Sequence, residues 1–193
     1  MRPRGRHAPV GYSTAATRPG DDLVADANMV FDRSRVIAAA PQQIWPWLVQ
    51  LGKQRAGWYL PAALERAVPR SRRGARVLDP RWQRLSIGQR IPDYGGRQAF
   101  LEVTILDPGR ALVYRSERRG AVFSWALTLD ALAPESTRVG LRFRGRIRSS
   151  GWRRRLVVAA GDLFDGVTSE LMLRGLAERV GAPSSSQSGP PSP

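Results

Sequence analysis

Few residues of this 193-residue chain could carry acid–base, nucleophilic or metal chemistry. The one histidine is His7, in an N-terminal segment that is short of large apolar side chains, and the chain has no cysteine. Ser-His-Asp and Cys-His systems, and metal sites built on histidine or cysteine, are therefore excluded as self-contained sites. The sequence predicts no metal and no cofactor, and it leaves the catalytic residues unassigned.

Two carboxylate pairs and one glycine pair are the remaining candidates for a chemical role. Asp162 and Asp165 lie on a predicted helix but point away from its apolar face, and Asp21 and Asp22 lie at the edge of the predicted domain. Solvated surface charge explains both pairs better than acid–base catalysis. Gly95-Gly96 lacks the strand-to-helix context of a phosphate loop, so a hairpin turn explains it.

The elements that would position a site begin with a short strand at 34–39, followed by a helix at 41–51. Pro41 suits a first helical turn and Gly52 suits the helix end. Apolar residues recur between them at helical spacing, at Ile44, Trp45, Leu48, Val49 and Leu51. A second short helix is predicted between Pro61 and Pro69.

Alternating apolar and polar residues then predict strands with one apolar and one wet face. The positions that should face inward are Leu101, Val103 and Ile105; Phe123, Trp125, Leu127 and Leu129; and Val139, Leu141 and Phe143. The wet face of the last strand carries Arg138, Arg142 and Arg144. Turn residues at 107–109 and 133–136 join consecutive strands into an antiparallel meander, after a short strand near 89–91.

A final helix is predicted over about 152–180. One apolar stripe on it should face the sheet, formed by Leu156, Ala160, Leu163, Phe164, Val167 and Leu171. The phase changes after Leu171, where Met172, Leu173, Leu176 and Val180 fall on another side. Either the helix bends near Gly175, or its last turns pack on another partner.

A strand that ends in Ala-Pro and enters a Trp-Pro-Trp helix, followed by Gly57-Trp58-Tyr59, resembles the SRPBCC or START-like superfamily. The resemblance is to the small bacterial members labelled polyketide cyclase or dehydrase, and it covers about residues 20–181. Further matching motifs are Asp79-Pro80, Gln83, Leu85, Gly88, Ile91-Pro92, Ser124-Trp125 and Thr137-Arg138. Members often carry an acidic residue after the glycine at position 88, whereas this chain has Gln89.

The resemblance implies an α+β helix-grip fold, in which a curved antiparallel sheet wraps around the long C-terminal helix and two short helices follow the first strand. It also implies an apolar cavity between helix and sheet, for which a volume of roughly 300–1,000 Å³ is expected. The candidate wall residues are Tyr59, Leu112, Tyr114, Trp125, Phe143, Phe164 and Val167. Core packing is the alternative for each, and the two tyrosines are favoured as ligand contacts because a buried hydroxyl needs a partner.

Composition sets the domain organisation and the expected location. Residues 1–20 and the Pro/Ser-rich residues 182–193 are predicted to be disordered tails, on either side of one domain at 21–181. The chain has neither a secretory signal nor an apolar run long enough to cross a membrane. With no cysteine, this favours a cytoplasmic protein.

The net charge of +15 is concentrated in two segments. Residues 66–84 include Arg70, Arg72 and Arg73, and residues 138–155 include Arg153, Arg154 and Arg155. These six arginines are the candidate basic surface, which would meet an anionic membrane or an acidic partner. The alternative is compositional bias with a solvated outer sheet face.

Three functions follow, in this order. The first is binding or carriage of an apolar small molecule, such as a lipid, a polyketide or an isoprenoid-like compound, in the internal cavity. The second is a polyketide cyclase or dehydratase, which the missing acid–base set weakens. The third is nucleic-acid binding, for which the charge supports only nonspecific attraction, so no specific nucleic-acid partner is expected.

Overall fold

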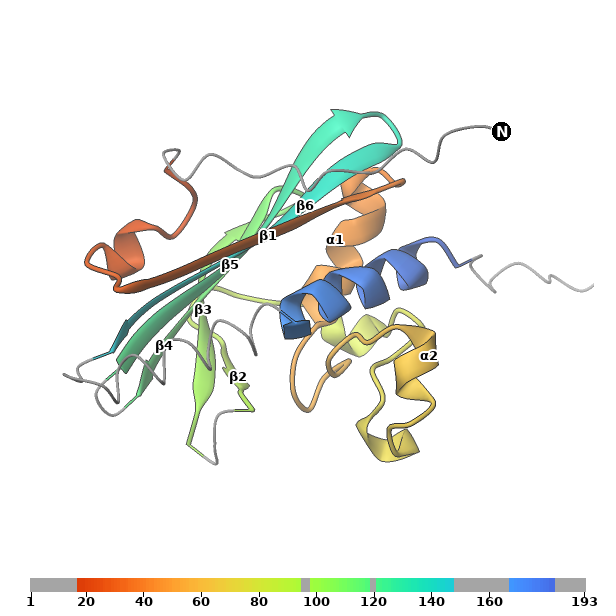
Figure 1. Ribbon diagram of the computed structural model, residues 1–193, viewed down its shortest axis with the longest axis horizontal. Helices are drawn as coiled ribbons and strands as arrows, with labels where there is room; N and C mark the ends of the chain where they lie inside the picture. Colours follow the sequence, from red (N-terminus) through yellow and green to blue (C-terminus); the bar gives the residue numbers. More distant parts are fainter. Residues whose placement is uncertain (1–16, 95–97, 119–120, 148–166, 183–193) are drawn as a thin grey trace, which may run out of the picture.

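A computed structural model describes residues 17–94, 98–118, 121–147 and 167–182. Six antiparallel strands form one curved sheet in the order β1-β6-β5-β4-β3-β2 (Figure 1). They are β1 (Met29–Ile37), β2 (Arg90–Pro92), β3 (Phe100–Asp107), β4 (Ala111–Arg118), β5 (Ala121–Ala133) and β6 (Ser136–Ile147). The predicted meander is confirmed from β2 to β6, and β1 closes the order by pairing with β6.

The first strand is longer than predicted, because β1 begins at Met29 rather than at residue 34. Its central residues, Asp32 to Arg35, are all polar, so this stretch lacks the alternation of apolar and polar residues that indicates a strand. Backbone pairing with β6 holds this stretch extended, from Met29 opposite Gly145 to Ile37 opposite Thr137. Polar side chains are tolerated there because β1 is an edge strand.

One strand changes phase part-way along. In β3, Val103 pairs with Tyr114, but the register shifts between Val103 and Ile105, so that Ile105 pairs with Val113 and Leu106 with Leu112. Leu106 therefore packs against the core. The prediction that Ile105 faces inward is wrong, because a β-bulge adds one residue and moves every later side chain to the other face.

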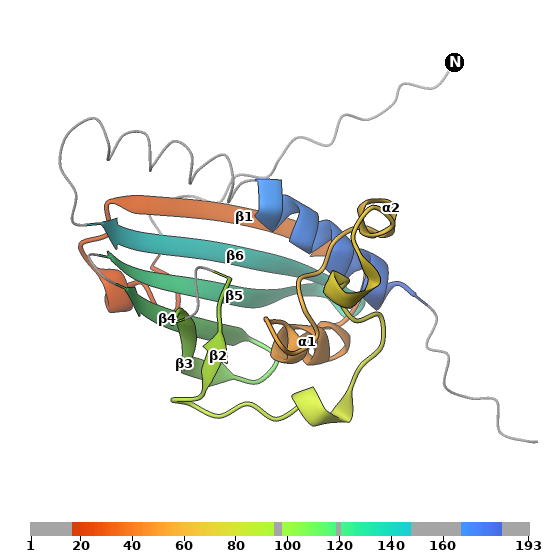
Figure 2. The same ribbon diagram turned by 90° about the horizontal axis from the view of Figure 1, so that it is seen from below.

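Three helices lie on one face of the sheet: α1 (Pro41–Gln50), α2 (Ala62–Glu65) and a C-terminal helix at residues 167–180 (Figure 2). Between α2 and β2 the chain forms two short 3₁₀ helices, η2 (Arg70–Arg72) and η3 (Pro80–Trp82). Pro41 occupies the first turn of α1, as predicted. The order of these elements confirms the helix-grip arrangement and, at the level of fold, the resemblance found in the sequence.

The C-terminal helix buries a different face from the one predicted. Met172, Leu173 and Leu176 are fully buried in the core, whereas Val167 is 52% exposed. The rotation is fixed at Gly175, because a Cβ there would lie 2.7 Å from the backbone of Tyr59 and Leu60. The last turns therefore pack within this chain, on the loop after α1. Most of the predicted stripe, 156–164, lies outside the described residues.

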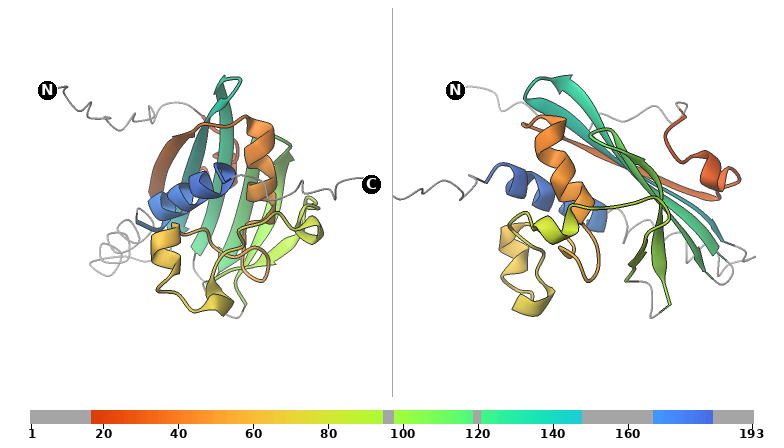
Figure 3. Two further views of the ribbon diagram at one scale, coloured as in Figure 1. Left: turned by 90° about the vertical axis from the view of Figure 1, so that its right-hand side faces the viewer. Right: turned by 180° about the vertical axis from the view of Figure 1, so that it is seen from behind.

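The opposite face of the sheet is covered by the N-terminal segment, residues 17–28, which contains the 3₁₀ helix η1 (Asp22–Val24) (Figure 3). Arg142, predicted to lie on a wet face, is only 6% exposed and forms ion pairs with Asp21 and Asp32. Arg18, which lies in the predicted tail, also pairs with Asp32, at 2.8 Å. The prediction of a solvated outer face is therefore wrong at Arg142, because the segment supplies carboxylates that bury it.

Among the helices of the described residues, none combines the length and the apolar character needed to span a membrane.

Candidate functional site

A row of aromatic side chains crosses the helix-covered face of the sheet. Tyr114 of β4 pairs with Trp125 of β5, and Trp125 pairs in turn with Phe143 of β6. On β1, Phe31 is paired with Phe143. The rings of Tyr114 and Trp125 stack with centroids 5.6 Å apart, and those of Phe31 and Phe143 stack at 6.0 Å. Three of the predicted wall residues, Tyr114, Trp125 and Phe143, are thus brought together by strand register.

A pocket of about 170 Å³ opens beside this row. Its lining residues are Trp58, Asp93, Leu101, Ser116, Arg118, Phe123, Trp125 and Phe143. Two of them, Trp125 and Phe143, were predicted as wall residues. The pocket is smaller than the 300–1,000 Å³ expected, and Trp58, one of its lining residues, packs on Trp125.

Phe123 lines the pocket, and its ring lies over a glycine of the neighbouring strand. It pairs with Gly145 of β6, and a Cβ on Gly145 would approach its ring to 2.9 Å. Its ring packs against Phe143 with centroids 5.3 Å apart. The sequence held a signal for this residue, since Phe123 precedes Trp125 by two positions on the predicted inward face. The same signal existed for Leu101.

Trp58, by contrast, is brought to the pocket by a loop. Its ring stacks on Trp125 with centroids 5.6 Å apart. The loop is closed by paired backbone hydrogen bonds between Gly52 and Gly57, and the Ala75 N–H donates to the Ala56 carbonyl at 2.7 Å. Gly57 has a φ of +77°, which a residue with a side chain adopts only with strain. No spacing rule in the sequence indicates where this loop places Trp58.

One end of the pocket is polar. Arg118, on the inward face of β4, forms an ion pair with Asp93, which follows β2 directly. Its Nε donates to the Ser116 hydroxyl at 3.4 Å, and its guanidinium carbon lies 5.4 Å from the centre of the Phe123 ring. Burial lowers the pKa of the Arg118 guanidinium. Asp93 is the one carboxylate among the described lining residues.

The two tyrosines predicted as ligand contacts differ in their hydroxyl partners. Tyr59 is fully buried, and its hydroxyl donates to the Trp47 carbonyl at 2.9 Å. The Tyr114 hydroxyl is also buried, but it has no hydrogen-bond partner among the described residues. Burial raises the pKa of both tyrosines above the ordinary value. Tyr59 and the fully buried Leu112 belong to the core and do not line the pocket.

The remaining predicted site residues are not brought to the pocket. Val167 is exposed, and Phe164 lies outside the described residues. Of the predicted basic surface, Arg70, Arg72 and Arg73 are all exposed, and Arg73 also donates to the carbonyls of Arg66 and Val68. Arg153, Arg154 and Arg155 lie outside the described residues.

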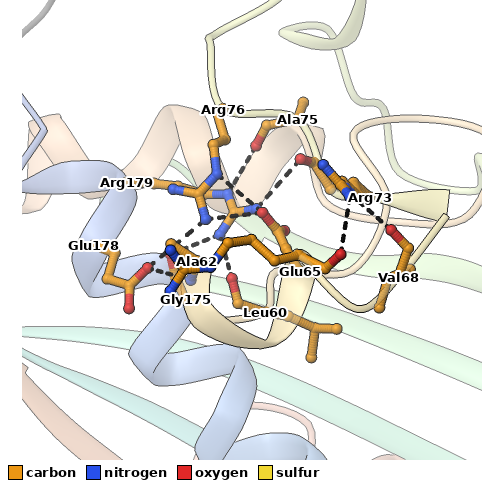
Figure 4. Close-up of polar contacts among 12 residues, drawn as sticks. Leu60, Ala62, Glu65, Val68, Arg73, Ala75, Arg76, Gly175, Glu178 and Arg179 are labelled. Atoms are coloured by element: carbon orange, nitrogen blue, oxygen red, sulfur yellow. Dashed lines mark hydrogen bonds and ion pairs between the residues drawn. The ribbon is translucent and has the colours of Figure 1, made fainter. Parts of the chain in front are cut away.

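A buried charge cluster, which the sequence did not indicate, holds the Trp58 loop to the C-terminal helix (Figure 4). Arg179 is fully buried and paired with Glu65 of α2. It also donates to the carbonyls of Leu60 at 3.0 Å and Ala75 at 2.7 Å, which flank the loop. Arg76 donates to the same Glu65 carboxylate at 2.9 Å. These contacts hold the C-terminal helix against the loop that carries Trp58.

The same cluster caps α2. Glu178 accepts a hydrogen bond from the Ala62 N–H at 2.7 Å, at the first residue of that short helix (Figure 4). Arg179 additionally lies with its guanidinium carbon 4.5 Å from the centre of the Tyr59 ring. All of these contacts join parts of the chain to one another, so the cluster acts as a structural clamp.

A larger hollow, of about 790 Å³, lies at the other end of β4, between residues 17–19, the β3–β4 turn and residues 128–131 of β5. Its walls are mainly turns and small or polar side chains, and no aromatic ring is among its described lining residues. Ligand pockets combine apolar and aromatic walls with a few placed polar groups, and the smaller pocket has that character. Within the described ranges, no three His, Cys, Asp or Glu side chains are placed to hold a metal ion.

No protein-family model matches the chain, and neither does any curated protein. Several solved structures do match the chain. An aromatase/cyclase, ZhuI, from Streptomyces sp. R1128 is 14% identical with a TM-score of 0.49, and the match covers 79% of this chain and 93% of that one. Protein MLL2253 from Mesorhizobium loti is 16% identical with a TM-score of 0.46, over 78% and 96% of the two chains. A norcoclaurine synthase mutant from Thalictrum flavum is 12% identical with a TM-score of 0.46, over 78% and 92%.

Proposed function

We propose that this protein binds a small apolar molecule with an aromatic ring in the pocket beside the aromatic row. The observation that supports this most directly is a space of about 170 Å³ walled by Trp58, Leu101, Phe123, Trp125 and Phe143. A concave wall of aromatic and apolar side chains with a few placed polar groups is the usual character of a small-molecule site.

The volume limits the ligand. Pockets for drug-sized molecules run to roughly 300–1,000 Å³, so this pocket takes one or two fused rings, or the ringed end of a longer polyketide or isoprenoid chain. The offset stacking surfaces of Trp58 and Trp125 favour a planar ring over a saturated chain. The proposal is for binding and carriage, and it includes no chemical step.

Calorimetric titration of the full chain with toluene and with naphthalene tests the proposal. Both should bind, and Trp58→Ala should weaken naphthalene at least tenfold, because it removes one stacking face from the pocket wall. Trp82→Ala is the matched control: Trp82 is also half-buried, but it contacts Arg55 and Arg81 rather than the pocket. Its affinity for naphthalene should stay within twofold of wild type. Absence of binding by both compounds to the folded wild-type protein would refute the proposal.

A further inference from the structure

The polar groups of the pocket gather at one end and come from separate elements. Ser116 and Arg118 follow each other on the inward face of β4, and Asp93 comes directly after β2. Trp58, on the loop after α1, also lines the pocket and carries a buried indole N–H. The rest of the described lining is apolar or aromatic. A ligand that fills the aromatic part would therefore place its polar end near Asp93, Ser116 and Arg118.

Hydrogen-bond donors outnumber acceptors at this end. The Trp58 Nε1–H is buried and has no partner among the described residues. The Arg118 guanidinium carries five N–H donors. Nη2 pairs with Asp93, and Nε donates to the Ser116 hydroxyl. A buried donor such as the Trp58 indole N–H normally has an acceptor, which a ligand could supply.

The position of Arg118 suits a planar anion. Its guanidinium lies over the Phe123 ring, at the boundary between the polar and aromatic parts of the pocket. Arginine binds carboxylates through two parallel N–H···O bonds, a geometry fixed by the planar fork. Asp93 already offers a carboxylate to this fork. The Asp93 side chain is 17% exposed and lies after the end of β2, where its Oδ1 also accepts from the Tyr94 N–H, so a ligand carboxylate can take its place on Arg118 without breaking a strand.

We propose that the pocket is selective for aromatic carboxylates, whose ring lies against Trp58 and Trp125 and whose carboxylate replaces Asp93 on Arg118. This inference rests on the proposed function and names the substrate class of the same site. Asp93 acts as a stand-in for the ligand: it neutralises Arg118 in the empty pocket and is displaced on binding. Exchange of one carboxylate for another leaves the buried charge paired in both states.

Three probes of similar ring shape test the inference by calorimetry: 2-naphthoate, its neutral isostere 2-naphthamide, and naphthalene. Wild type should bind 2-naphthoate at least tenfold more tightly than either neutral compound. Arg118→Gln should weaken 2-naphthoate at least tenfold more than it weakens naphthalene. Asp93→Asn should strengthen 2-naphthoate severalfold, because it removes the competing carboxylate. The two substitutions at one ion pair should thus act in opposite directions.

Arg115→Gln is the matched control. Arg115 lies on the same strand, faces outward, and pairs with the exposed Glu117, so the change in net charge is the same. It should leave the affinity for 2-naphthoate within twofold of wild type. Arg118→Lys serves as a second variant if the glutamine variant does not fold: it keeps the charge, loses the fork, and should retain part of the preference for the carboxylate.

The outcomes separate this inference from the proposed function. If naphthalene binds as tightly as 2-naphthoate, the pocket binds rings without selecting carboxylates, and the inference is overturned while the proposed function stands. If Asp93→Asn and Arg118→Gln both weaken 2-naphthoate, the pair is a structural strut, and the inference is equally overturned. If none of the three probes binds wild type, the proposed function fails with it.

Discussion

At the scale of single residues, the fold distinguishes two tyrosines that the sequence ranked together. Both are buried on the helix-covered side of the sheet. The Tyr59 hydroxyl donates to Trp47 of α1 and helps to seat the helix, whereas the Tyr114 hydroxyl has no described partner. Their rings also differ in role, because Tyr114 stacks on Trp125 and supports the pocket wall from behind.

Removing each hydroxyl should therefore have different effects. Tyr59→Phe leaves the buried Trp47 carbonyl without its donor and should lower the free energy of unfolding by about 1–3 kcal/mol. Tyr114→Phe removes an unpaired polar group, keeps the ring, and should change the free energy by less than about 0.5 kcal/mol or raise it. Urea unfolding followed by tryptophan fluorescence measures both values. Equal losses for the two variants would show that the Tyr114 hydroxyl has a partner, such as a buried water.

At the scale of elements, close packing determined which face of β3 and of the C-terminal helix lies against the core, which the local sequence pattern did not. The β-bulge in β3 turned Leu106 inward in place of Ile105. The C-terminal helix lies on Met172, Leu173 and Leu176, because its Gly175 crosses the loop backbone at Tyr59. In both elements, apolar side chains lie on more than one face. Hydrophobic periodicity alone therefore does not determine which face packs against the core.

Gly175→Ala tests that crossing. Alanine is favoured over glycine in a helix by about 1 kcal/mol, but its Cβ would lie 2.7 Å from the backbone at residues 59–60, where no side chain can move aside. We expect a net loss of about 1–2 kcal/mol in the free energy of unfolding, as for other overpacked sites. Ala177→Gly, on the same helix, measures how much the difference in helix propensity between alanine and glycine contributes. It should lower the free energy of unfolding by about 1 kcal/mol. A stabilised Gly175→Ala variant would contradict the crossing.

At the scale of the whole molecule, ion pairs join segments that are distant in sequence. On one side of the sheet, Asp21 and Asp32 neutralise Arg142. On the other, Glu65 pairs with Arg179 and Arg76 and joins α2 to the C-terminal helix. Several arginines that read as surface charge in the sequence are thus internal counter-ions. Breaking such a buried pair by removing one partner typically costs about 3–5 kcal/mol.

The Glu65 clamp predicts a specific acid sensitivity. Burial alone would raise the pKa of the Glu65 carboxyl, but the hydrogen bonds from Arg179 and Arg76 and their charges leave its pKa lowered. A lowered pKa in the folded state means that the stabilisation is present above the unfolded pKa, about 4.3, and is lost as the pH falls through the folded value. Glu65→Gln should therefore cost about 3 kcal/mol at pH 7 and progressively less as the pH falls below about 4.

Chemical denaturation of wild type and variant between pH 7 and pH 2.5 measures this difference. Glu135→Gln, in the exposed β5–β6 turn, is the control and should change the free energy of unfolding little at any pH. A gap between wild type and Glu65→Gln that stays constant down to pH 2.5 would contradict the role given to the carboxylate, because a protonated Glu65 and a glutamine are both neutral.

The sequence by itself determined the order of elements and the broad fold. Pro41 and Gly52 marked the first helix, and alternation marked β5 and β6, because helix ends and strand faces depend on neighbours a few residues away. The same local signal placed Trp125 and Phe143 on the inward face. It could not extend β1 through its polar centre, since that stretch is held extended by pairing with β6.

Only the tertiary structure decided the site. Trp58 lines the pocket from a loop that Glu65 and Arg179 hold in place. Asp93, which follows β2, pairs with Arg118 of β4. The N-terminal segment covers a face that alternation marked as wet. Each of these contacts joins residues that are far apart along the chain. Their positions are set by how whole elements pack, which no pattern within one element records.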